Sequence, residues 1–442
     1  MKEKQIYVCS NCGYESPKWF GKCPICNEWN TAFEKKSDYN NLKSSSVTFK
    51  SVEQIKIDEF RRLKTNISEF DRLVGGGIVP GSVLLIGGDP GVGKSTLMLE
   101  IAENLSRFGE VFYITGEESE EQILLRALRI GVKKNSSLKV TSTSDLEGVL
   151  AALNSEKPVA IIVDSIQSMR LSNAGLPGSV VQLRDCTEAL VRYAKSTGIP
   201  IFIVGHITKE GQIAGPKLLE HLVDVVLYFE GEIQTGYRIL RSIKNRFGPS
   251  NEIAIFEMRN DGLKEVKNPS EIFIERNNLS SGSCITSALE GTRNIFLEIQ
   301  SLVSKTFFPS PRRLSKGIDI GRIVFISAVL SRRLNIPLES FDIYVNVVGG
   351  LNVKDPSIDL GIAVAVYSAF ADIKIDSDCI YIGEIGLDGR IRKVNNIEKR
   401  LTEAHKMGFK KVVMPYDKDA KKIKNLELIQ YSSLLDVLKE LT

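Results

Sequence analysis

Residues 88–96 read GDPGVGKST, a glycine-rich loop that ends in a lysine and two hydroxyl side chains. In such a loop the backbone N–H groups surround phosphate oxygens, Lys94 places a positive charge near the terminal phosphates, and Ser95 can ligate Mg²⁺. An apolar run precedes the loop and a helix-like stretch follows it, which is the context that this motif requires. The sequence therefore predicts a site for ATP and Mg²⁺. The expected nucleotide-binding residues are Gly88, Asp89, Pro90, Gly91, Val92, Gly93, Lys94, Ser95 and Thr96.

Carboxylates follow two other apolar runs. Asp164 ends the run AIIV, where an aspartate can hold the Mg²⁺ shell together with Ser95, or can instead cap the next helix. Glu117 and Glu118 follow the run VFYI across a Thr-Gly pair, close to where a carboxylate must orient and deprotonate the attacking water. One of these two glutamates is expected to be the general base, and the sequence leaves open which one.

His206 follows a further apolar run, in IFIVGHITKEG. From this position an imidazole can sense the terminal phosphate and pass the signal into the following loop. A lone histidine can equally have only a structural role, and the sequence leaves both readings open.

Two CxxC pairs lie within the first 26 residues and are separated by ten residues. This spacing is typical of a structural zinc site with four thiolate ligands. Because the segment is too short to fold by apolar burial alone, the metal is expected to supply its folding free energy, with Trp19 and Trp29 packing its flank. A redox pair and free thiols are the alternatives, although the βαβ context of a redox motif is absent. The four cysteines are Cys9, Cys12, Cys23 and Cys26.

Length and composition bound the rest of the chain. The 442 residues are 43% hydrophobic and 25% charged, which is typical of a soluble protein with about three domains. The charged N-terminus MKEKQIYVCS is not a signal peptide and no apolar run is long enough to span a membrane, so we expect a cytoplasmic protein. A net charge of +4 says nothing about nucleic acid, because a localised basic surface is what matters there.

Changes in composition divide the chain into a finger (1–34), a flexible polar linker (35–51), a motor domain (52–266), a second linker (267–283) and a C-terminal domain (284–442). In the motor domain, five apolar runs alternate with helical stretches, which predicts an α/β fold with a parallel sheet wrapped by helices. Two later runs, 237–243 and 252–257, are expected to add antiparallel strands. Ligand-binding groups should gather at the carboxyl ends of the parallel strands.

The motifs GDPGVGKST, YITGEES, VDSIQ, GHITKEG and KNRFG, together with the N-terminal CSNCG and KWFGKCPICNEWNT, resemble the bacterial RadA/Sms family of recombination proteins over nearly the whole chain. The resemblance implies a RecA-type P-loop ATPase core, a small N-terminal zinc finger and a C-terminal α+β domain similar to that of Lon protease. It also implies that Lys244 and Arg246 of KNRFG act in trans on the triphosphate of a neighbouring protomer. Active sites would then form only in a homo-oligomeric ring, expected to be a hexamer. Alternatively, both side chains pair with local carboxylates of their own chain.

DNA would pass through the centre of such a ring, held by the loops 170–184 and 209–217. Lys209, Lys217 and Arg184 are the hypothesised phosphate contacts, and each could instead be an ordinary surface charge. Neither loop contains an aromatic residue that could stack on a base.

The C-terminal segments VNVVGGLNVKDPSIDLGIAVAVYSA and IGEIGLDGRIRKVNNIEKRLTEAHKMGFKKVVMP resemble the proteolytic domain of Lon, whose serine nucleophile is activated by a lysine. Ungapped matching places Ile358 at the serine and Glu398 at the lysine, and neither can do that chemistry. Ser357 is adjacent, but strand alternation predicts that it faces the other way. We expect an inactive scaffold that helps to assemble the ring. Its candidate DNA-facing residues are Arg312, Arg313, Lys316, Arg390 and Arg392.

The expected function is that of a DNA-dependent ATPase and ring helicase. By resemblance, it acts on single-stranded and branched DNA beside the RecA recombinase, and promotes branch migration in homologous recombination and DNA repair. ATP hydrolysis is predicted from the residues themselves. Two alternatives remain: a KaiC-like ATP-driven switch scaffold, suggested by the adjacent pair Glu117 and Glu118, and an ATP-dependent protease of the Lon type, disfavoured by Ile358 and Glu398.

Overall fold

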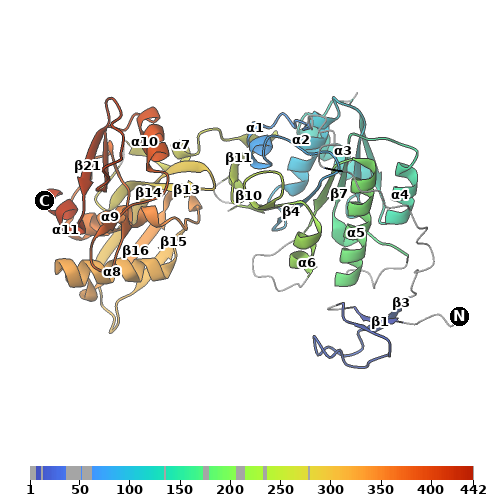
Figure 1. Cartoon of the computed structure of the whole chain (residues 1–442), viewed down its shortest axis with the longest axis horizontal. Coiled ribbons are helices and arrows are strands. Elements are labelled where there is room, and N and C mark those ends of the chain that lie inside the picture. Colours follow the sequence, from blue (N-terminus) through green and yellow to red (C-terminus); the bar gives the residue numbers. More distant parts are fainter. Residues whose placement is uncertain are drawn as a thin grey trace. The chain divides into compact units, whose positions relative to one another are not determined.

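The computed structural model describes residues 6–10, 13–35, 51, 62–133, 136–172, 179–205, 215–231, 236–276 and 279–441. The chain divides into two compact units, Met1–Val266 and Lys267–Thr442, and each unit is described here by itself (Figure 1). Within the described ranges, no helix is both long enough and apolar enough to cross a membrane.

The described part of the first unit is built on a nine-stranded sheet with the order β12-β11-β10-β9-β4-β8-β7-β5-β6. The predicted parallel core and its antiparallel extension are confirmed. The sequence did not predict β6, because an edge strand with one exposed face carries no continuous apolar run. Nor did it predict β12, which has only four residues. The parallel strands are β4 (Val83–Gly88), β5 (Val111–Thr115), β6 (Leu138–Ser142), β7 (Ala160–Asp164), β8 (Ile201–Val204) and β9 (Val225–Glu230), and the antiparallel ones are β10 (Tyr237–Asn245), β11 (Ile253–Arg259) and β12 (Gly262–Glu265).

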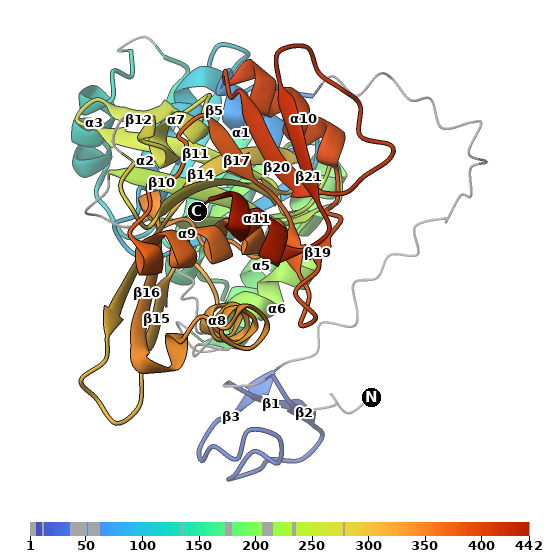
Figure 2. The same ribbon diagram turned by 90° about the vertical axis from the view of Figure 1, so that its left-hand side faces the viewer.

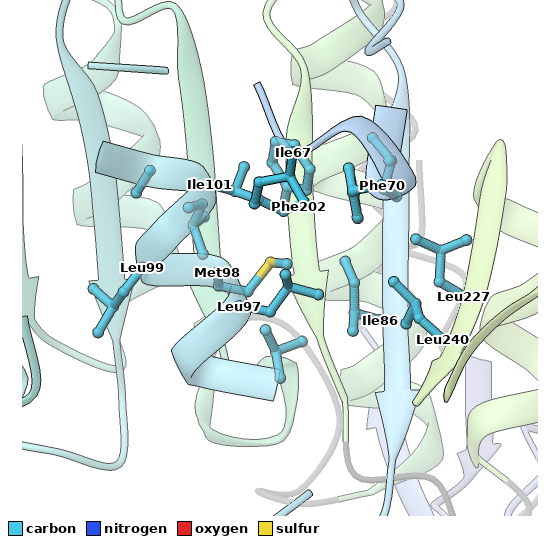
Figure 3. Packing of buried hydrophobic residues seen from close by; sticks show 14 of the residues in the cluster. Ile67, Phe70, Ile86, Leu97, Met98, Leu99, Ile101, Phe202, Leu227 and Leu240 are labelled. Atoms are coloured by element: carbon cyan, nitrogen blue, oxygen red, sulfur yellow. The ribbon is translucent and has the colours of Figure 1, made fainter. Parts of the chain in front are cut away.

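Helices cover both faces of this sheet because successive strand side chains point to opposite faces. In β4, Leu84 and Ile86 belong to one core cluster, whereas Val83 and Leu85 belong to the other. Figure 3 shows the first cluster, in which α2 side chains pack beside Ile86 and Leu240. Each large apolar side chain buried in this way contributes roughly 1.5–3 kcal/mol. The first face is covered by α1 (Ser68–Leu73), α2 (Lys94–Leu105) and α3 (Glu120–Arg129), and the second by α4 (Leu146–Leu153), α5 (Val180–Thr197) and α6 (Gly215–Leu222).

In its described residues the second unit combines a four-stranded sheet, β13-β14-β16-β15, with a three-stranded sheet, β17-β20-β21, and the short pair β18-β19 (Figure 2). Helix α9 packs against β13 and β14 and is buried on almost all sides. The strands are β13 (Ser283–Glu290), β14 (Arg293–Lys305), β15 (Arg313–Lys316), β16 (Phe341–Val347), β17 (Cys379–Tyr381), β18 (Glu384–Ile385), β19 (Ile391–Arg392), β20 (Lys411–Pro415) and β21 (Glu427–Tyr431), and the helices are α7 (Ser270–Phe273), α8 (Ile320–Leu334), α9 (Asp359–Ala371), α10 (Ile397–Lys406) and α11 (Leu434–Glu440).

The stretch 267–283, expected to be a linker, contains α7 and packs in part into the second unit. Phe273 is 1% exposed, and Ile274 belongs to the apolar cluster that contains Phe296. The Ser270 hydroxyl accepts a hydrogen bond from the backbone N–H of Phe296, 3.1 Å away. This packing explains why the second unit begins at Lys267.

The N-terminal finger has a small sheet of β1 (Ile6–Cys9), β2 (Glu15–Ser16) and β3 (Ala32–Lys35), in the order β2-β1-β3 among its described residues. The expectation that Trp19 and Trp29 pack its flank is wrong: they are 61% and 67% exposed. The buried positions are taken instead by Val8, Cys9 and Cys23.

Candidate functional site

The phosphate-binding loop joins the end of β4 to the start of α2. Gly88 and Gly93 have φ values of 147° and 112°, in a region that side chains other than glycine rarely adopt. At Gly88 a Cβ atom would also lie 2.4 Å from the carbonyl oxygen of Phe229 on β9. Helix α2 begins directly at Lys94, so its free N-terminal N–H groups stand at the loop, as an anion site requires.

A cavity of about 400 Å³ opens at the carboxyl ends of β4, β5 and β7. Six of the nine predicted loop residues line it, together with the predicted Asp164, Glu117 and Glu118, so the sheet brings together residues that are far apart in the sequence. Its lining residues are Pro90, Gly91, Gly93, Lys94, Ser95, Thr96, Thr115, Glu117, Glu118, Arg126, Arg129, Asp164, Arg238 and Met258. Of the remaining loop residues, Gly88, Asp89 and Val92 contribute backbone carbonyls to the contacts around Lys94 and Arg238.

Lys94 is buried inside its own loop. The side chain is 5% exposed, and Nζ donates to the carbonyl oxygens of Gly88 at 2.7 Å and of Asp89 at 2.8 Å. Burial lowers the pKa of Lys94, and the charges of Asp164, Asp89 and Glu117 oppose that effect. The ammonium group is thus held against the loop backbone, close to these three carboxylates.

The three acidic residues have different partners. The Tyr113 hydroxyl donates to Asp164 Oδ2 at 2.5 Å, and burial followed by the Asp164 charge raises the pKa of Tyr113, so the phenol remains a proton donor. The Ser165 hydroxyl donates to Glu117 Oε1. Glu118 forms an ion pair with Arg126 at 2.8 Å.

Two buried polar atoms of that ion pair have no hydrogen-bond partner within the described residues: Glu118 Oε2 and Arg126 Nη1. An unsatisfied buried polar group costs about 1–3 kcal/mol, more when it is charged. Phosphate oxygens would satisfy the guanidinium, and a hydrated divalent cation would satisfy the carboxylate. The residues present therefore fit a nucleotide carrying Mg²⁺.

Sequence reasoning missed several side chains at this cavity. Arg126 and Arg129 are an i,i+3 pair on α3, so they share a helix face, and this spacing was a usable signal. Arg238 lies on β10 and reaches the loop by donating to the Val92 carbonyl at 3.0 Å, which only the strand order reveals. Tyr113 looked like an ordinary core residue of β5.

Lys244 and Arg246 do not line the cavity of their own chain. Lys244 Nζ donates to the carbonyls of Glu220 at 2.7 Å and Val223 at 2.9 Å, at the end of α6. Arg246 pairs with Asp224 at 3.2 Å. In the single chain Arg246 thus pairs with a local carboxylate, whereas Lys244 contacts backbone carbonyls rather than a carboxylate. The Arg246 side chain is 54% exposed.

Few of the expected DNA contacts can be placed. Lys209 and the Lys217 side chain lie outside the described residues, as do residues 173–178 of the first loop. His206, the candidate phosphate sensor, also lies outside them. Arg184 lies on α5, where it pairs with Glu188 at 2.8 Å.

In the second unit, Arg312 stacks on the Phe308 ring at 3.5 Å. Arg390 pairs with Asp388 at 2.6 Å. Arg313 donates to the carbonyls of Phe341 and Leu338, whereas Lys316 and Arg392 lie on β15 and β19.

Among the described residues, no hydrogen bond or ion pair joins Ile358 and Glu398, which were matched to the serine and lysine of Lon, whereas the adjacent Ser357 contacts Arg400. Ser357 lies in a short 3₁₀ turn rather than a strand, so strand alternation does not apply to it. Arg400 Nη1 donates to Ser357 Oγ at 2.9 Å, and that hydroxyl donates to the Ser287 carbonyl at 2.7 Å.

Ile358 is buried, and Glu398 is an exposed partner of Lys421. Because a guanidinium stays protonated, Arg400 cannot act as the base that a serine nucleophile needs.

The cysteine cluster of the finger fits a tetrahedral thiolate site. The Sγ atoms of Cys9, Cys23 and Cys26 lie within 4.8 Å of one another. Cys9 and Cys26 are 3.6 Å apart, close to the roughly 3.8 Å edge of a tetrahedron with metal–sulfur bonds of about 2.3 Å. Cys12, the expected fourth ligand, lies outside the described residues.

Comparison with known proteins agrees with this architecture. The chain is 49% identical over 426 residues to the DNA repair protein RadA of Bacillus subtilis, covering 94% of this chain and 93% of that protein. It is 45% identical over 451 residues to the DNA repair protein RadA of Listeria monocytogenes, covering 99% and 98%. The chain belongs to the RadA family. The resemblance seen in the motifs is thereby confirmed, and so is the predicted fold class.

Models of three domain families match parts of this RadA-family chain. They are the rubredoxin metal binding domain at residues 7–32, the AAA domain at 50–212 and the subunit ChlI of Mg-chelatase at 325–418. Among solved structures, the crystal structure of the RadB recombinase is 22% identical, with a TM-score of 0.38, and covers 46% of this chain and 100% of that chain.

Proposed function

We propose that this chain is an ATP-hydrolysing DNA motor, a DNA-dependent ATPase and ring helicase. It would process recombination intermediates and promote branch migration in homologous recombination and DNA repair. One observation carries the ATPase part: Lys94, Asp164 and Glu117 converge on one cavity at the phosphate-binding loop. The DNA part is supported by the relatives, which are DNA repair proteins.

The loop and Lys94 would bind the phosphates through N–H groups and a positive charge. Ser95 and Asp164 would hold Mg²⁺, which when bound neutralises phosphate charge and orients the terminal phosphoryl group. Tyr113 has a positioning role: its hydroxyl fixes one oxygen of Asp164 and leaves the other available to the metal shell. Arg126, Arg129 and Arg238 add positive charge around the same cavity.

We assign the general base to Glu117. Glu118 is held in an ion pair with the Arg126 guanidinium at 2.8 Å, so its carboxylate already has a partner on α3. Glu117 instead accepts a hydrogen bond from the hydroxyl of Ser165, the residue that follows Asp164, so its carboxylate is oriented beside the metal ligand. From there it can accept the proton of a water that attacks the terminal phosphate.

Lys244 and Arg246 would complete the site of a neighbouring protomer in a ring, which we propose to be a hexamer. To do so they must leave their local partners. For Arg246 this cost is limited, because its side chain is half exposed and the buried Asp224 keeps Lys195 at 2.7 Å and the Val83 N–H at 3.1 Å. Lys244 must give up two carbonyl contacts, and burial followed by the nearby Arg246 charge lowers its pKa. A new anionic partner would offset both effects.

The decisive experiment is steady-state ATP turnover with and without single-stranded DNA. The samples are the wild type, Lys94→Ala, Lys244→Ala and, as a control, Lys264→Ala, whose exposed lysine pairs with Asp261 away from the site. A motor requires strong stimulation by DNA that both Lys94→Ala and Lys244→Ala abolish and Lys264→Ala leaves intact. Turnover that ignores DNA would refute the motor and favour a switch scaffold.

Mixing two inactive variants tests the shared site. Protomers carrying Lys94→Ala keep Lys244 and Arg246, and protomers carrying Lys244→Ala with Arg246→Ala keep their phosphate-binding loop. If Lys244 and Arg246 act in trans, mixed rings regain part of the turnover. The reason is that some interfaces then combine an intact loop from one protomer with an intact Lys244 and Arg246 from its neighbour. Mixtures with no more activity than their components would show that both residues act only within their own chain.

A further inference from the structure

The two tryptophans of the whole chain both lie on the finger, and both face solvent. Trp19 is 61% exposed and Trp29 is 67% exposed, an unusual position for the largest apolar side chain. A Cβ atom at Gly21 would lie 3.4 Å from the Trp19 ring and 3.9 Å from the Trp29 ring. Both indole rings therefore lie beside Gly21, where the missing side chain leaves room for them.

The backbone beneath these rings is held firmly. Lys22 and Trp29 form an antiparallel bridge, the Asn30 N–H donates to the Gly21 carbonyl at 2.8 Å, and the Cys23 N–H donates to the Glu28 carbonyl at 2.9 Å. Cys23, one of the clustered cysteines, lies in the same hairpin. The indoles are thus presented on a rigid base, so a ligand that stacks on them pays little ordering entropy.

The charges around the indoles favour a ligand with flat apolar faces over a plain polyanion. Residues 6–35 contain three lysines and three glutamates, so the finger has no excess positive charge. Lys18 and Lys22 are nevertheless exposed beside the rings, with Lys22 Nζ 5.8 Å from the Trp29 ring centre. Together they offer two stacking surfaces flanked by two cations, which is the combination used to bind unpaired nucleotides.

The two loops of the motor domain that are expected to hold DNA have no side chain that could stack on a base. The sequence of residues 170–184 and 209–217 contains lysines and arginines but no aromatic residue. Contacts to phosphates hold a strand without engaging its bases. A side chain that stacks on bases would therefore have to come from elsewhere in the chain.

We propose that Trp19 and Trp29 form a stacking platform for the unpaired bases of single-stranded DNA. This proposal rests on the DNA-motor function proposed above and adds a second DNA site to it. Stacking does not depend on base identity, so the platform would distinguish unpaired from paired strands rather than read sequence. Loss of either indole is expected to weaken binding of a short single strand about 5- to 100-fold.

Intrinsic fluorescence tests this directly, because all tryptophan emission of the full-length protein comes from these two indoles. A dye-labelled oligothymidylate is titrated while tryptophan emission and dye anisotropy are recorded on the same sample. An abasic oligonucleotide of equal length serves as the probe with phosphates but no bases. The expected result is quenching by the oligothymidylate in step with anisotropy, and no quenching by the abasic strand at equal occupancy.

Three outcomes overturn the proposal. Binding of the oligothymidylate without any emission change would show that the indoles do not touch it, while leaving the DNA-motor function standing. Equal emission changes with both probes would show an indirect conformational effect. No binding of either probe would remove this proposal together with the proposed motor function.

Variants of the full-length chain provide the control. Trp19→Ala and Trp29→Ala should weaken binding of the oligothymidylate but not of the abasic strand, and Trp29→Tyr should recover part of the loss. Ile25→Ser removes another apolar side chain of the finger, 67% exposed, and should change neither affinity. If Ile25→Ser weakens binding as much as the tryptophan variants do, any loss of apolar surface weakens binding and stacking on the indoles is refuted. Zinc content measured on each variant establishes that the finger is folded.

Discussion

Replacing Arg400 by methionine is expected to destabilise the second unit selectively. Arg400 is 1% exposed. Its guanidinium donates to Asn395, Ser287, Ser357 and Asp355, the last at 2.5 Å. Methionine fills most of the volume but satisfies none of these acceptors. Removing one partner of a buried ion pair costs about 3–5 kcal/mol.

The remaining Asp355 contacts refine this magnitude. Its carboxylate keeps the backbone N–H groups of Leu289 at 2.6 Å and Ser357 at 3.0 Å, so it is not left without any donor. Burial alone would raise the pKa of Asp355, but the Arg400 guanidinium and the N–H groups of Leu289 and Ser357 together outweigh burial and hold that pKa below its ordinary value. The pair therefore contributes stability above the unfolded pKa of the carboxyl and loses it as the pH falls through the lower, folded pKa.

Differential scanning calorimetry is the appropriate measurement, because the two units can unfold separately and tryptophan emission reports only on the finger. For a unit of this size, 3–5 kcal/mol corresponds to a fall in Tm of about 6–20 °C. The transition of the ATPase unit should not move. Hydrogen exchange should rise in β13 and α9, which carry or adjoin Ser287 and Ser357.

Two matched variants test whether the loss of stability comes from the buried Arg400–Asp355 pair. Arg390→Met removes an arginine whose side chain is 75% exposed and should change stability by less than about 0.5 kcal/mol. Asp355→Asn combined with Arg400→Met removes the unpaired buried charge and should be less destabilised than Arg400→Met alone. An Arg400→Met protein that melts like the wild type would show that the buried network contributes nothing to stability.

Three further predictions concern the ATPase unit. Burial raises the pKa of Glu100 to about 7, so this carboxyl destabilises the native state as the pH rises from 4.5 towards 7. Glu100→Gln should therefore increase the free energy of unfolding by roughly 1–2 kcal/mol at pH 8 and leave it unchanged at pH 4. Denaturant titrations at the two pH values measure this difference. Tyr113→Phe removes the donor that positions Asp164 and should lower kcat for ATP about tenfold with KM nearly unchanged, whereas an unchanged kcat would remove that role. In Gly88→Ala the new Cβ meets the Phe229 carbonyl, so this variant should lose about 3 kcal/mol or more of stability. Gly91→Ala, at a φ of 77° with nothing within 4 Å of the new Cβ, should lose only about 1–2 kcal/mol. Equal stabilities of the two variants in thermal melts would contradict the clash at Gly88.

Much of the ATPase fold and site could be predicted because its signals are local. A glycine loop between a strand and a helix, and a carboxylate at the end of a buried strand, can each be recognised within a short window of sequence. The parallel arrangement then follows from alternating strands and helices, and it places the ends of β4, β5 and β7 at one edge of the sheet. For the same reason Lys94, Glu117 and Asp164 were found without knowledge of the strand order.

The sequence by itself determined the chemistry that this chain carries: the phosphate-binding loop, the acidic residues, the cysteine pairs and the family to which they belong. Only the tertiary structure decided which partner each group has. It pairs Glu118 with Arg126, Asp164 with Tyr113, and Ser357 with Arg400, contacts that span 8, 51 and 43 residues. It also places both indoles of the finger in solvent. Hydrogen-bond partners and exposure depend on how elements pack in space, and residue type and spacing along the chain do not encode that packing locally.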